Sequence, residues 1–119
     1  MWRRGPLACV LPTLAAATPF DGTYRQAANV DCALVGADGG SLRIDDGIFY
    51  GVDMQCRMTK PVNVLEMDAI LYTLECTGER DIWSERVMLM NAAEGDGVYM
   101  IWDGYAFRYE RCDVPGDDG

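Results

Sequence analysis

The sequence contains no histidine and a single lysine, Lys60. Without histidine, neither a Ser-His-Asp triad nor a Cys-His pair can form, and the most common zinc ligand is missing. Basic residues are few, because 10 lysines and arginines stand against 19 aspartates and glutamates, for a formal net charge of −9. Nucleic acids and anionic membrane surfaces attract positively charged protein surfaces. We therefore expect no nucleic-acid partner.

Long apolar runs are also lacking, which excludes a transmembrane helix. The longest run covers residues 6–17, about 12 residues, whereas a bilayer-spanning helix needs about 20. It follows two arginines and ends in three alanines, the pattern of a secretory signal peptide. A buried helix is the alternative, but Pro12 disfavours it, and residues 6–8 are a poor lipidation motif for Cys9. We expect residues 1–17 to be removed and the protein to be periplasmic or secreted.

The cysteines that follow this leader are widely spaced. Successive gaps between Cys32, Cys56, Cys76 and Cys112 are 24, 20 and 36 residues. Cysteines that bind metal usually come as close pairs, so a metal site and free thiols are the weaker alternatives. An even number of distant cysteines behind a signal peptide favours two disulfides. We expect no metal and no cofactor.

The pairing of these cysteines follows from strand order. Cys56 and Cys76 lie in successive expected strands, which are usually neighbours in an antiparallel sheet. Cys32 follows the first expected strand and Cys112 ends the last, and these strands become adjacent when a meander closes. We predict Cys56–Cys76 and Cys32–Cys112. The alternative is Cys32–Cys56 with Cys76–Cys112.

Turn signals divide the chain into short alternating segments. Asp45-Asp46-Gly47, residues 94–97 and Asp103-Gly104 each supply the positive backbone angle of a tight hairpin turn. The length of 119 residues fits one domain, which we place at residues 18–112, before a flexible acidic tail at 113–119. We predict an all-β fold, a small antiparallel meander of about seven or eight strands that forms a barrel or a two-layer sandwich. Residues 62–67 could form one helical turn.

The many carboxylates raise the question of catalysis. Asp45 with Asp46, or Glu79 with Asp81, could be paired as the acids of a hydrolase. These residues lie in expected turns and strand ends, where solvated acids are common. The spacing of the Asp-Gly turns does not match a calcium-binding EF-hand loop. We therefore expect a protein that is not an enzyme, and a carboxylate-dependent hydrolase is the least favoured hypothesis.

Two expected strands are apolar on both faces. Residues 86–90 and 98–102 carry apolar side chains at odd and even positions alike, although one face of each strand suffices to fill a core. The other face must be covered, and methionine is frequent at adaptable binding surfaces. The candidate binding face comprises Trp83, Met88, Met90, Tyr99, Ile101 and Tyr105. The alternative is that the loop at residues 61–67 buries this face.

The overall plan is similar to that of periplasmic lysozyme inhibitors, which are secreted, disulfide-bonded meanders. This resemblance covers architecture alone and implies an inhibitor-like function without assigning residues. We expect a secreted protein-binding module, an inhibitor or an accessory subunit of a larger assembly, whose negative charge favours a basic partner. The alternative is a small barrel that binds an apolar ligand, which a cavity lined by Phe49, Met100 and Trp102 would favour. Residues 20–24 also resemble the start of lipocalin-type barrels.

Overall fold

The computed structural model describes residues 17–112, and these form β-strands joined by turns. Their order and bounds are β1 Gly22–Arg25, β2 Asp31–Val35, β3 Gly40–Asp45, β4 Ile48–Gly51, β5 Met54–Asn63, β6 Ala69–Thr77, β7 Ile82–Asn91, β8 Val98–Trp102 and β9 Tyr105–Arg111. No helix occurs within this part of the chain, and therefore none that could cross a membrane. The expected signal peptide at 1–17 and the tail at 113–119 lie, apart from Ala17, outside the described residues.

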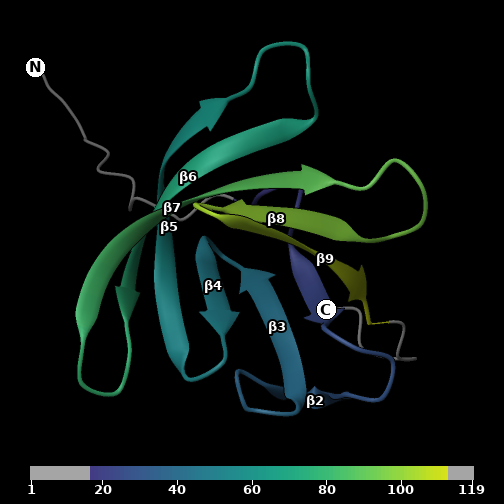
Figure 1. The fold of residues 1–119 in the computed structure, drawn as a ribbon, viewed down its shortest axis with the longest axis vertical. Coiled ribbons are helices and arrows are strands. Elements are labelled where there is room, and N and C mark those ends of the chain that lie inside the picture. Colours follow the sequence, from purple (N-terminus) through teal and green to yellow (C-terminus); the bar gives the residue numbers. More distant parts are fainter. Residues whose placement is uncertain (1–16, 113–119) are drawn as a thin grey trace, which may run out of the picture.

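Eight of the strands close into an antiparallel barrel, and β2 lies beside it. From β3 to β9 each strand pairs with the next along the chain, and β1 pairs with both β3 and β9 (Figure 1). The closing contact joins Tyr24 to Arg111 and Arg25 to Glu110. Closure leaves no free sheet edge along these paired segments. The prediction of an all-β meander is confirmed, and the structure selects the barrel over the sandwich.

Both predicted disulfides are present. Cys56 and Cys76 are directly opposite each other in β5 and β6, with Cα atoms 3.9 Å apart. Cys32–Cys112 joins β2 to the end of β9, with Cα atoms 6.2 Å apart and 80 residues between them. The second bond therefore links the extra strand β2 to the end of the last strand of the barrel. Both disulfides are consistent with an extracellular or periplasmic location.

The barrel interior is filled at its centre. Ile44, Leu74, Leu89, Val98 and Met100 are each at most 1 % exposed and come from four different strands. Alternate residues of each strand point inward, as the period-two pattern requires. The core is therefore a packed layer of side chains and not a channel.

One end of the barrel is closed by the segment that precedes β1. Phe20 is fully buried, and its ring meets the Tyr72 ring edge-on at 6.5 Å. The Tyr24 hydroxyl donates a hydrogen bond to the Phe20 carbonyl at 2.6 Å, and the Asn91 amide donates to the Pro19 carbonyl at 3.3 Å. The β5–β6 hairpin extends beyond the barrel and is the tallest feature in Figure 1. The opposite end, at which β8 ends and β9 begins, is called the mouth below.

Two local expectations need correction. Residues 62–67 form no helical turn: β5 continues through Lys60 and Pro61 to Asn63, and its register against β6 shifts between Thr59 and Val62. Lys60 adopts a positive φ of 52°, so the chain bulges there and resumes pairing. Proline is tolerated at such a bulge because its missing N–H is not needed in the ladder. The second correction is β2, a short parallel partner of β3 that was not expected as a strand.

Candidate functional site

The outer surface of the barrel carries a row of apolar side chains that crosses five strands. Successive cross-strand pairs link its members, which we call the apolar band: Val62 of β5, Leu71 of β6, Met88 of β7, Ile101 of β8 and Ala106 of β9. Met90 and Tyr99 are paired in the next row and extend this surface. Cross-strand packing covers the central side chains in part, while Val62 at one end is 52 % exposed. The apolar surface is therefore continuous.

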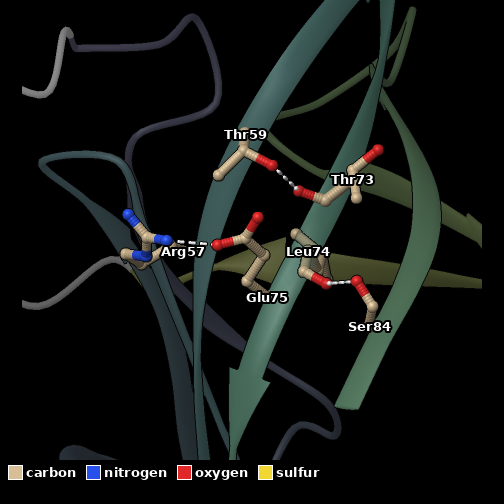
Figure 2. A network of polar contacts seen from close by, with 6 residues as sticks. All are labelled: Arg57, Thr59, Thr73, Leu74, Glu75 and Ser84. Carbon is tan, nitrogen blue, oxygen red and sulfur yellow. Dashed lines mark hydrogen bonds and ion pairs between the residues drawn. The ribbon is translucent and has the colours of Figure 1, made fainter.

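Polar contacts mark one border of the apolar band. Figure 2 shows the ion pair between Arg57 and Glu75, and the Thr59 hydroxyl donating to the Thr73 carbonyl at 2.8 Å. These residues belong to the two outward rows next to the band on β5 and β6. The Ser84 hydroxyl of β7 donates to the Leu74 carbonyl at 3.3 Å. The outer face thus changes from hydrogen-bonded polar rows to an apolar row within two residues along β6 and within three along the bulged β5.

The β5–β6 loop does not bury its apolar residues. Leu65 is 85 % exposed and Met67 is 52 % exposed, so both side chains remain largely open to solvent. These exposed fractions do not support the alternative that residues 61–67 bury the outward methionines. Within the described residues, the outer face of Met88 and Ile101 keeps its partial exposure.

The mouth holds a second candidate site, an aromatic cleft of about 270 Å³. Its lining, which we call the mouth cleft, includes Phe49 of β4, Glu85 of β7, Trp102 of β8, and Tyr105, Phe107 and Tyr109 of β9. The cleft is bordered by β9 at the segment where β1 no longer pairs with it, since their contact ends at Glu110. Tyr105 and Phe107 are therefore 61 % and 43 % exposed although they point to the inner side of β9.

Glu85 is the one acidic residue in the lining of the mouth cleft. The indole N–H of Trp83 donates to one Glu85 carboxylate oxygen at 2.7 Å, which fixes the side chain on the inner side of β7. Among residues 17–112, no arginine or lysine lies within ion-pair distance of this carboxylate. The sequence analysis did not single out Glu85. Its odd position in β7, shared with the inward Val87 and Leu89, could have placed it on the inner side.

The six residues of the expected binding face lie on two different surfaces. Met88, Met90, Tyr99 and Ile101 point outward and form or border the apolar band. Trp83 is paired with the buried Cys76, and Tyr105 with Trp102, so both belong to the inner side near the mouth. Strict counting of odd and even positions along residues 82–91 separates Trp83 from Met88 and could have shown this division.

The expected ligand cavity is present only in part. Phe49 and Trp102 line the mouth cleft, and their rings are 6.1 Å apart. Met100 is instead 1 % exposed and belongs to the packed core. The mouth cleft therefore stops short of the barrel centre, because Met100 is not in its lining.

The acids considered for catalysis lie at two turns. Asp45 ends β3 beside Asp46 in the β3–β4 turn, whereas Glu79 and Asp81 lie together in the β6–β7 turn at the opposite end of the barrel. Each is exposed. Within the described part of the chain, no three Cys, Asp or Glu side chains are grouped to hold a metal ion. The two candidate binding sites are therefore the apolar band and the mouth cleft.

Comparison of the chain with models of known protein families, with curated protein sequences and with solved structures found no match.

Proposed function

We propose that this chain is a secreted, non-enzymatic protein-binding module that contacts its partner through the apolar band. The observation that carries the proposal is the continuity of the band across β5 to β9. Polar residues usually occupy the outward positions of a small barrel, because those positions face water. Five adjacent outward positions here are apolar instead, and contiguous exposed apolar surface is typical of a contact site.

The charge of the chain favours a basic partner. The formal net charge is −9, so a positively charged protein would be attracted before any contact forms. Apolar contact would then supply most of the affinity, since exposed charges contribute little once paired. An inhibitor of a basic enzyme and an accessory subunit of a larger assembly both fit this description.

A capture experiment with matched variants tests the proposal. The immobilised wild-type protein should retain a basic protein from a periplasmic extract of its source, and less of it at high salt. The double variant Met88→Gln/Ile101→Thr should lose this protein. Tyr105→Ser, an apolar-to-polar change at a more exposed position at the mouth, should retain it.

Two results would contradict the proposal. Equal capture by the double variant and the wild type would remove the apolar band from the interface. Light scattering after gel filtration gives the second: a wild-type dimer that the double variant abolishes would assign the band to a second copy of this chain. As a control, the thermal unfolding of every variant is measured, and a cooperative transition shows that the variant is folded.

The second candidate function is binding of a small apolar ligand, and the mouth cleft is the observation that favours it. Its aromatic lining and partial exposure are those of a ligand site, while its volume of about 270 Å³ suits a molecule smaller than a typical drug.

A further inference from the structure

We propose that the mouth cleft binds a small organic ammonium ion. This inference rests on the second candidate function, that the cleft is a binding site, and it assigns the chemical class of the ligand. It is independent of the apolar band, which lies on the outer surface of the barrel.

The aromatic rings of the cleft supply the first part of the argument. Along the inner side of β9, the Phe107 ring lies 5.7 Å from the Tyr105 ring at a steep angle and 5.9 Å from the Tyr109 ring in a stacked arrangement. The Trp102 ring, on the neighbouring strand, lies 6.1 Å from Phe49 across the cleft. Tyr105 and Phe107 are also exposed, and the π-face of an accessible aromatic ring attracts cations.

Glu85 supplies the second part. One of its carboxylate oxygens accepts the Trp83 indole N–H, and the other has no hydrogen-bond partner among residues 17–112. Glu85 is the one acidic group in this aromatic lining, so a cation that enters the cleft would have its counter-ion there. A purely apolar ligand would bury this charge without compensation.

The turns around the mouth give the third part. Asp53, Glu79, Asp81 and Asp103 lie in the turns at this end of the barrel, against one basic residue, Arg80. Their combined field raises the local concentration of cations at the entrance. Aromatic faces, an unpaired carboxylate and an acidic rim therefore favour the same class of ligand.

Two probes of the same shape separate charge from apolar contact. Choline carries a trimethylammonium group, and 3,3-dimethylbutan-1-ol carries a neutral tert-butyl group in its place. We would titrate the disulfide-bonded full chain with each probe and follow the indole N–H signals of Trp83 and Trp102 by NMR. Choline should bind about tenfold more tightly than the alcohol at low ionic strength.

Matched variants assign the effect to the cleft. Glu85→Gln keeps an acceptor for the Trp83 indole and should weaken choline binding about tenfold, while binding of the alcohol changes less than about twofold. Glu66→Gln, in the β5–β6 turn, removes the same charge far from the mouth and should leave choline binding unchanged. Phe107→Leu keeps apolar volume but removes a π-face, so it should reduce the preference for choline without affecting folding at this exposed site.

The outcomes are distinguishable. Equal affinity for the two probes, or equal effects of Glu85→Gln and Glu66→Gln, would overturn the ammonium assignment and leave an apolar ligand site. If neither probe shifts the tryptophan signals, both this inference and the second candidate function are overturned. Should Glu85→Gln fail to fold, the choice rests on Phe107→Leu, whose unchanged preference for choline would likewise overturn the inference.

Discussion

Single residues tie the two ends of the chain together at the closed end of the barrel. The Arg111 guanidinium donates to the Asp21 carbonyl at 2.9 Å and to the Tyr24 hydroxyl at 3.2 Å, and it lies 5.0 Å from the centre of the Tyr24 ring. Tyr24 in turn holds the Phe20 carbonyl. One arginine thus joins β9 to β1 and to the segment that plugs the barrel.

Burial of tyrosine hydroxyls makes the stability of the fold sensitive to alkaline pH. Burial raises the pKa of Tyr24, Tyr72 and Tyr109 above the ordinary value of 10.0, and for Tyr24 this outweighs the opposing effect of Arg111. Above about pH 10 the unfolded chain therefore loses these protons more readily than the folded chain. The contribution of these tyrosines to the free energy of unfolding should therefore stay constant from pH 8 to about pH 10 and fall as pH rises further. Denaturant unfolding at pH 8 to 11 measures this.

Tyr109→Phe is the matched variant for this prediction, because burial is the one cause of its raised pKa. It should change stability little at pH 8 and make the alkaline decline shallower. A decline of the same steepness in Tyr109→Phe and wild type would show that buried tyrosines are not its source.

At the scale of elements, the two disulfides constrain very different lengths of chain. Cys32–Cys112 closes a loop of 80 residues and Cys56–Cys76 one of 20. In the chain-entropy account, the longer loop stabilises by about 4–5 kcal/mol and the shorter by about 3 kcal/mol. Replacing both cysteines of the longer bridge by serine should therefore lower the free energy of unfolding more than the same change in the shorter bridge.

Denaturant unfolding of the two double variants measures the difference. The shorter bridge is fully buried inside the barrel, so alanine variants of both pairs separate loop length from the burial of serine hydroxyls. A larger loss from the Cys56/Cys76 alanine variant would show that packing inside the barrel, and not loop length, sets the stabilisation.

Hairpins with tight turns were predictable from the sequence, whereas irregular pairings were not. The Asp-Gly turns lie between consecutive strands as expected, and this order of strands was enough to pair the cysteines. The strand β2 makes few backbone pairs, and it runs parallel to β3. An alternating sequence pattern does not predict such a short parallel contact. Lys60 and Pro61 interrupt the strand pattern locally, and pairing on both sides of the bulge preserves β5.

The candidate sites were predictable in composition but not in arrangement. The alternating pattern of residues 86–90 predicts that Met88 and Met90 point away from the side that Val87 and Leu89 fill. Because one apolar face is enough to fill a core, the second apolar face indicated a contact surface. The joining of Val62, Leu71, Met88, Ile101 and Ala106 into one band depends on register, which the bulge at Lys60 shifts. The mouth cleft depends on the early end of β1, which leaves β9 partly unpaired.

The whole molecule is a closed barrel with a plugged end, an aromatic mouth and one apolar band on its outer wall. The plug and the packed centre leave no passage through the described part of the chain, and the two candidate sites lie at the mouth and on the wall. The chain as a whole carries an excess of negative charge, which attracts basic partners or cations.

Methionine oxidation footprinting tests the central claim, that the apolar band is the surface that contacts a partner protein. Met88 and Met90 are partly exposed on the wall, Met54 is partly exposed at the mouth, and Met100 is 1 % exposed in the core. In the isolated protein the first three should be oxidised and Met100 should resist. In the complex with the captured basic partner, Met88 and Met90 should become protected while Met54 remains reactive. Unchanged oxidation of Met88 and Met90 in the complex would contradict the account, and protection of Met54 instead would place the partner at the mouth.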